Sequence, residues 1–140
     1  MQRDLVLRWI ESMAKLIRAL LRRGDAPSLE AAQDQLENAA REYLGPMADL
    51  ARRLEPASVA EILADPYRIY GYAHLVALES AVARALGRRD EADRLAARGV
   101  ALGELAIERH GNAPPEWTTW VAAAQAGPEW ETAEEPPPSE

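Results

Sequence analysis

The chain contains two histidines and no cysteine, so it offers few candidates for metal binding or acid-base catalysis. On a helix, His74 falls on the same side as Tyr70 and Leu78 and away from Arg68. A metal ligand or general base would need a carboxylate within reach of the ring. We therefore predict that His74 is a buried, hydrogen-bonded core residue. We predict that His110 caps a helix C-terminus, where a cation complements the helix dipole.

The carboxylates do not form a recognised metal or catalytic pattern. Glu104 and Glu108 are one helical turn apart, as in many metal-binding bundles, but the chain contains no Glu-x-x-His pair. It also lacks a Gly-rich phosphate loop and a nucleophile placed on a strand-to-helix turn. We predict no catalytic, cofactor-binding or metal-binding residues, and a protein that is not an enzyme. A small-ligand-binding or enzymatic helical bundle around His74 is an alternative.

Three tryptophans near the C-terminus are candidate partner-binding residues. Trp117 and Trp120 lie in the last expected helix, and Trp130 lies beyond it in an acidic segment rich in proline. An aromatic side chain among acidic residues can anchor a short peptide to a partner. The segment could equally fold back into a groove between the helical hairpins, with Trp130 held by Trp117 or Trp120.

Two other groups of residues have both a structural and a functional interpretation. Tyr67, Tyr70 and Tyr72 gather at the start of a long helix, where core packing at one end of the molecule is favoured over a recognition patch. Arginine pairs stand at 22–23, 52–53 and 88–89, near expected helix ends, where they would complement the dipole. The alternative is that they bind an acidic partner, including the chain's own C-terminal segment.

Composition predicts that these residues are carried by helices alone. The 140 residues are enough for one domain, Ala is the commonest residue, and Phe is absent. Asp4 and Glu11 interrupt what would be the core of a signal peptide, and the chain has no run of about 18 apolar residues. We therefore expect a cytoplasmic, all-α protein that does not span a membrane.

The charge is unevenly distributed along the chain. The net charge is −7, and residues 114–140 contain six Glu residues but no Lys or Arg. The remaining basic residues alternate with acidic ones instead of forming a stripe, which disfavours nucleic-acid binding. We predict a helical domain over 1–126 and a disordered, acidic, Pro-rich tail over 127–140.

Hydrophobic spacing and capping residues predict about five to seven helices arranged as antiparallel hairpins. The first helix is expected to be well buried along a broad apolar stripe. This stripe consists of Leu5, Trp9, Met13, Leu16 and Leu20, flanked by Val6, Ile10, Ile17 and Leu21. Ser28 is expected to cap the second helix, Ser58 and Glu61 to form a capping box, and Asp65 to start a long helix. The expected helices cover residues 3–23, 28–44, 47–54, 58–64, 65–86, 90–110 and 114–126.

Small residues line the two long helices of the C-terminal half. Ala73, Ala77, Ala81 and Ala85 recur every four residues on one helix, and Gly99 and Gly103 interrupt the other. Each interior glycine costs about 1 kcal/mol relative to Ala unless packing compensates. We predict that these two helices pack closely against each other.

Two stretches share a pattern of basic turn, acidic residue and Ala, then Leu and Ala at helical steps: residues 20–44 and 86–107. This pattern resembles tetratricopeptide-like helical repeats, although the spacing of the two units exceeds the usual repeat of about 34 residues. The opening residues Arg3-Asp4, Arg8 and Ile10-Glu11 also resemble a family of short, uncharacterised bacterial proteins described as tetratricopeptide-like. The resemblance implies a helical-hairpin fold and no particular activity.

Together these features favour a non-enzymatic protein-protein interaction or adaptor module, with no cofactor and an unidentified protein partner. A homodimer that uses an exposed helix face is one form that this module could take. A homo-oligomeric structural protein, whose partner is another copy of itself, is the main alternative.

Overall fold

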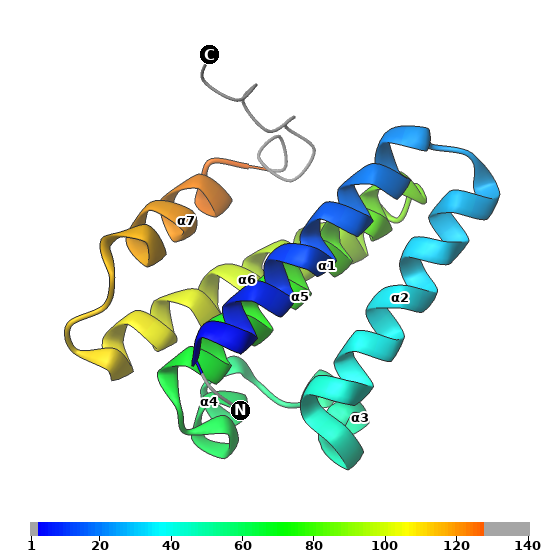
Figure 1. Cartoon of the computed structure of the whole chain (residues 1–140). Coiled ribbons are helices and arrows are strands. Elements are labelled where there is room, and N and C mark those ends of the chain that lie inside the picture. The colour runs from blue at the N-terminus through cyan, green and yellow to red at the C-terminus, as the bar shows by residue number, and fades with distance from the viewer. Residues whose placement is uncertain (1–2, 128–140) are drawn as a thin grey trace.

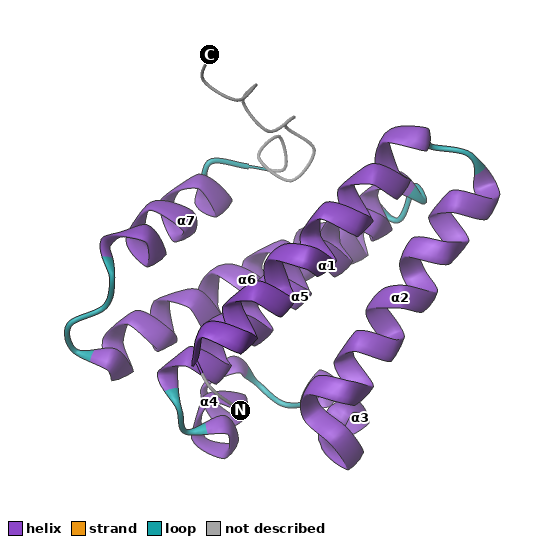
Figure 2. Ribbon diagram, in the orientation of Figure 1, coloured by secondary structure: helices purple, strands orange, loops and turns teal. Residues whose placement is uncertain are grey.

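The computed structural model describes residues 3–127, and every regular element in this range is a helix (Figures 1 and 2). The all-α prediction is therefore confirmed. The predicted acidic tail, including Trp130, lies outside the described residues. The helices are α1 (Arg3–Arg23), α2 (Ala26–Leu44), the 3-10 helix η1 (Gly45–Met47), α3 (Ala48–Arg53), α4 (Pro56–Leu63), α5 (Pro66–Ala85), α6 (Arg89–His110) and α7 (Pro115–Gln125).

Helix α5 is the centre of the molecule. It contacts α1, α2, α4 and α6, and it forms an antiparallel hairpin with α6 just as α1 does with α2 (Figure 1). Its buried residues lie on all of its sides, which is typical of a helix enclosed by others. Helix α7 packs on α6 at the edge of this bundle. The core is thus built around α5, and the helices packed on α5 form the walls of any site at the surface.

Close packing between α5 and α6 follows the small residues. A Cβ atom added to Gly99 would lie 3.4 Å from the carbonyl oxygen of Ala73, so the backbones approach closely there, as predicted. The buried Ser80 hydroxyl donates a hydrogen bond of 2.7 Å to the Ala92 carbonyl across the same interface. Gly103 differs from the prediction, because its added Cβ would meet Val121 of α7 at 2.7 Å and not α5.

Another glycine allows three helices to meet. A Cβ atom added to Gly71 of α5 would lie 2.5 Å from the Tyr43 hydroxyl of α2 and 2.7 Å from the Cδ1 atom of Ile10 of α1. The same Tyr43 hydroxyl donates a hydrogen bond of 2.8 Å to the Arg68 carbonyl. Residue 71 therefore has to be small for α1 and α2 to pack on α5.

Only part of the apolar stripe predicted for α1 is buried. Its flanking members Val6, Ile10 and Ile17 are buried, whereas Leu5 is 52% and Leu16 42% exposed. Because α1 packs against both α5 and α2, its inner face is centred on these flanking residues. The prediction that Leu5 and Leu16 are buried is wrong.

Two of the three predicted helix caps are also wrong. Asp25, and not Ser28, caps α2: its carboxylate accepts hydrogen bonds from the Ser28 N–H at 3.1 Å and the Ser28 hydroxyl at 2.7 Å. Helix α4 begins after Glu55, so residues 58 and 61 lie inside it and form no capping box. The Asp65 cap is confirmed, with a hydrogen bond of 2.9 Å from the Tyr67 N–H.

Arginine residues connect the short helices to the bundle in a way that the sequence did not indicate. Arg98 of α6 donates to the carbonyl of Leu54 at 2.7 Å and also to the carbonyl of Ala51, so it binds the C-terminal end of α3.

The arginine pair at 88–89 lies at the start of α6 and not at a helix C-terminus. A positive charge opposes the helix dipole there, so the predicted dipole stabilisation is wrong for this pair.

Candidate functional site

Helix α7 is fixed to the bundle by an aromatic cluster, which we define as Tyr67, Tyr70, His110 and Trp117. Trp117 is 2% exposed, and its ring stacks on Tyr70 with a centroid distance of 4.2 Å. Tyr67 meets Trp117 edge-on at 4.9 Å, and His110 does so at 5.4 Å. This cluster closes one end of the core, as predicted for Tyr67 and Tyr70. Tyr72 is buried outside the cluster, beside Arg98.

Trp120 lies three residues beyond Trp117 and contacts His74. The two rings stack with their centroids 4.2 Å apart and an angle of 26° between their planes. Tyr70 packs edge-on against both of them, at 4.6 Å from His74 and 5.7 Å from Trp120. Trp120 is only partly buried, so part of its ring remains accessible at the surface.

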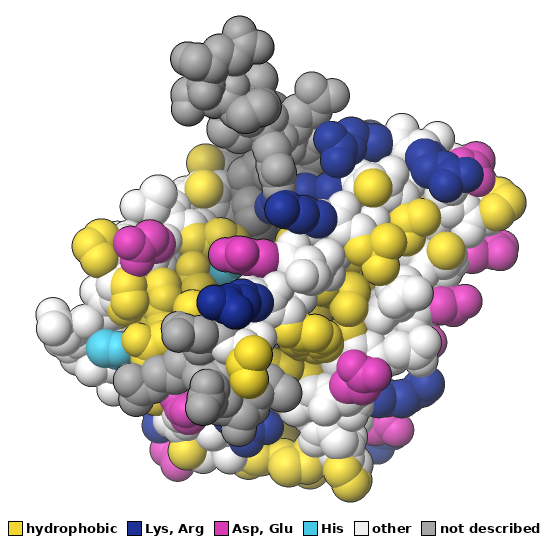
Figure 3. Space-filling model, in the orientation of Figure 1, with side chains coloured by type: hydrophobic (Ala, Val, Ile, Leu, Met, Phe, Trp, Pro, Cys, Tyr) yellow, Lys and Arg dark blue, Asp and Glu magenta, His cyan; other side chains and the backbone are white. Residues whose placement is uncertain are grey.

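A groove lies between α1 and α7, with α5 as its floor. It consists of two adjoining hollows of about 560 Å³ and about 320 Å³, both lined by Ile10, Glu11 and His74. Figure 3 shows hydrophobic side chains gathered between α1 and α7. The larger hollow is also lined by Leu7, Tyr67, Tyr70, Pro114, Glu116 and Trp117. The smaller hollow is also lined by Ala14, Lys15, Arg18 and Trp120.

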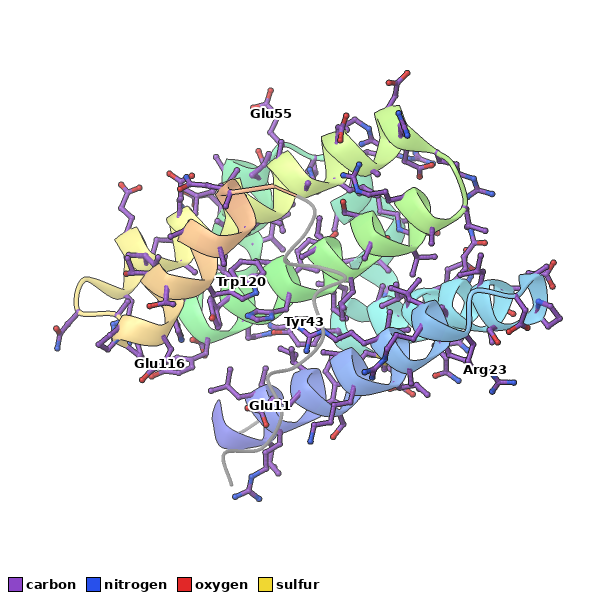
Figure 4. The ribbon with its side chains drawn as sticks, turned by 90° about the horizontal axis from the view of Figure 1, so that it is seen from above. Glu11, Arg23, Tyr43, Glu55, Glu116 and Trp120 are labelled. Carbon is purple, nitrogen blue, oxygen red and sulfur yellow. The ribbon has the colours of Figure 1, made fainter. Side chains whose placement is uncertain are left out.

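The two walls of this groove run in parallel, and the charge of their side chains changes from one end of the groove to the other. Glu116 lies at the end where α7 begins, and Glu11 lies in the middle, across from Trp120 (Figure 4). Lys15 and Arg18 line the other end, toward which α7 ends. The groove therefore has an acidic end, an apolar and aromatic middle, and a basic end.

His74 lines both hollows and carries an unpaired polar atom. Its Nε2 atom is buried and has no hydrogen-bond partner among the described residues. Burial, and secondarily the positive charge of Arg18, lower the pKa of His74 to about 3, so the ring is neutral at physiological pH. His74 does lie toward the core as predicted, but the prediction that it is hydrogen-bonded is wrong for Nε2. An unpaired buried polar atom is uncommon in proteins and suggests a missing partner.

The predicted partner-binding tryptophans have different environments. Trp117 is enclosed in the aromatic cluster, so its ring contributes to core stability and offers little surface to a partner. Trp120 forms part of the groove wall. Trp130 lies outside the described residues. His110, predicted to act as a cationic cap, instead accepts a hydrogen bond of 3.3 Å at Nδ1 from the Asn112 N–H.

A second polar cluster lies on another side of α5. The carboxylate of Glu79 is 3.6 Å from Arg52, and its side chain is only 19% exposed. Burial raises the pKa of Glu79, while Arg52 and Arg98 oppose this shift. The hollows here enclose only about 70 Å³ and about 100 Å³, which is enough for a few waters. We interpret this cluster as a structural connection between α3, α5 and α6.

Among the described residues, neither region contains a cluster of metal-ligand side chains. Within residues 3–127, His, Asp and Glu side chains form no group of three or more that could hold a metal ion. No helix in that range is long and apolar enough to cross a membrane. The α1–α7 groove is therefore the strongest candidate for a functional surface. Comparisons of the chain with protein-family models, with curated proteins and with solved structures give no match.

Proposed function

We propose that this protein is a non-enzymatic interaction module whose α1–α7 groove binds a short peptide segment of a partner protein. The observation that carries the proposal is the groove itself, with its aromatic wall at Trp120 and the buried, unpaired Nε2 atom of His74 at its floor. Its larger hollow, of about 560 Å³, falls in the size range of ligand sites. The proposal includes three expectations from the sequence: a cytoplasmic location, a bacterial source and a tetratricopeptide-like arrangement of the helices.

The lining of the groove indicates what kind of peptide it would bind. An aromatic side chain that bears a hydrogen-bond donor would fill the apolar middle and pair with Nε2 of His74. Acidic residues next to this anchor would be attracted by Lys15 and Arg18. Such exposed charges contribute mainly to orientation, because surface ion pairs are worth about 0–1 kcal/mol. The aromatic anchor would therefore supply most of the affinity.

Selection from a phage-displayed library of random peptides, using the full chain as bait, tests this proposal. We expect enrichment of peptides with a Trp or Tyr beside acidic residues. The best synthetic peptide should bind at least about tenfold more weakly to Trp120→Ala, a loss of about 1.4 kcal/mol. Leu50→Ala is the matched control, because Leu50 is a 50% exposed apolar residue on α3. Failure to enrich any peptide, or equal binding to both variants, would contradict the proposal.

Self-association is a second candidate, supported by Leu5 and Leu16, which are exposed on α1. Apolar residues of this size on one helix can form part of an interface between copies. Light scattering of the parent chain and of a Leu5→Glu, Leu16→Glu double variant distinguishes self-association from peptide binding by a monomer. A parent dimer that becomes monomeric in the double variant would support this candidate, and a parent monomer would exclude it.

A further inference from the structure

We infer that residues 128–140 of this same chain occupy the α1–α7 groove, with Trp130 against Trp120 and His74, so that a partner peptide must displace them. The regulatory part of this inference rests on the function proposed above.

The described chain ends beside the basic end of the groove. Both walls advance in the same direction, since the larger hollow contains Leu7 and Trp117 and the smaller one contains Arg18 and Trp120. Helix α7 ends at Gln125, which is about 7.5 Å beyond Trp120 along the helix axis. The chain therefore leaves α7 at the end of the groove that Lys15 and Arg18 line.

The length of chain beyond Gly127 is sufficient for Trp130 to return to the groove. Gly127 has a φ of +127°, a conformation that favours glycine and allows the chain to turn. The three residues from Gly127 to Trp130 span up to about 10 Å. At a helical rise of about 1.5 Å per residue, Gly127 lies about 10 Å beyond Trp120 along the axis, so a segment of this length can just return to that residue.

The charge of residues 128–140 complements this end of the groove. They contain five Glu residues and no Lys or Arg. Two of the five, Glu129 and Glu131, flank Trp130, and Lys15 and Arg18 line the hollow that the tryptophan would enter. At the other end, Glu116 would repel the same residues, and Glu11 in the middle of the groove would oppose their extension toward that end. The charge order therefore favours docking at the basic end over docking along the whole groove.

The indole of Trp130 matches the chemistry at the floor of the groove. A neutral imidazole has one acceptor nitrogen, and an indole N–H is a donor only. Burial and the charge of Arg18 keep the His74 ring neutral by lowering its pKa to about 3. Docking of Trp130 would give the buried Nε2 atom a partner and cover the accessible part of Trp120.

The first test measures where the C-terminal segment lies in the full chain. Because the chain has no cysteine, Thr132→Cys accepts a single nitroxide spin label two residues from Trp130. We expect the label to broaden the amide resonances of Ala14 and Lys15 on α1 but not that of Leu50 on α3. Adding Trp130→Ala to the labelled chain should remove the broadening on α1. Absence of broadening on α1, or broadening unchanged by Trp130→Ala, would overturn the inference.

The second test measures competition and uses a synthetic peptide of residues 128–140 as the probe. It should bind the full-length Trp130→Ala chain about tenfold more tightly than the parent chain. A tenfold ratio of affinities means that, in the parent chain, residues 128–140 leave the groove open about one tenth of the time. A peptide that itself carries Trp130→Ala is the matched control and should not bind. Equal affinity of the probe for both chains would overturn the inference.

The two proposals fail in different ways. If the library selection yields groove-binding peptides while the spin label broadens nothing on α1, the docked segment is refuted and the interaction module remains. If broadening on α1 depends on Trp130 while no library peptide is enriched even on the Trp130→Ala chain, docking within the chain stands and the proposed partner binding is refuted.

Discussion

Replacement of His74 by Phe should remove much of the acid sensitivity of this protein. The native pKa of His74 is lowered from 6.5 to about 3, first by burial and then by the charge of Arg18. Between these two values the unfolded chain binds a proton at His74 and the native chain does not. Stability therefore decreases as the pH falls below about 6.5, and the loss continues until the pH reaches the native pKa.

The size of this effect follows from the two pKa values. At pH 4.5, which is two units below the unfolded value, the linkage amounts to about 2.7 kcal/mol, compared with about 0.2 kcal/mol at pH 7. The parent chain should therefore lose about 2.5 kcal/mol more than His74→Phe between pH 7.0 and pH 4.5. Other titrating groups act on both chains alike, so the difference between the chains isolates His74.

Urea unfolding followed by circular dichroism at the two pH values measures this difference. At pH 7.0 the Phe variant should be at least as stable as the parent, because it removes a buried polar atom that is unpaired among the described residues. His110→Gln, which changes the second histidine, is the control and should keep the acid sensitivity of the parent. Equal losses of stability in the parent and His74→Phe chains would refute the reasoning.

Three further substitutions test the packing of the bundle. Gly71→Ala should cost about 1–3 kcal/mol in urea unfolding, since its Cβ atom would lie 2.5 Å from the Tyr43 hydroxyl; no loss would contradict the close approach. Ser80→Ala should cost about 0.5–1.5 kcal/mol through its lost hydrogen bond to Ala92, and a stabilised variant would contradict this. Arg98→Lys should speed hydrogen exchange in α3 but not in α5, because an ammonium group cannot reproduce the guanidinium fork; equal exchange would contradict this.

The sequence predicted the helices well because their signals are local. Asp65 followed by Pro66 marks the start of α5, and Gly111 in the left-handed conformation marks the end of α6. Proline is favoured in the first turn of a helix, so Pro27 itself indicates a cap upstream of Ser28, and the cap of α2 is Asp25.

The candidate site was only partly predictable because it joins residues distant in sequence. The spacing of four residues placed His74 beside Tyr70, and this contact is present. Nothing local indicates that Lys15 of α1 and Trp120 of α7 line one hollow, since periodicity does not specify which helices become neighbours. The burial of Glu79 was missed for the same reason, because the carboxylate is covered by Arg52 of α3.

The hydrogen bonds from Arg98 to the end of α3 affect the order in which the helices can pack during protein synthesis. Leu54 and Arg98 are 44 residues apart, so the carbonyls of α3 leave the ribosome well before the side chain that binds them. At a translation rate of about 5–20 residues per second, this delay is roughly 2–9 s. For that interval α6 is not available to the helices that precede it. The connector from α3 to α4 therefore reaches its final position only when the second half of the domain has been made.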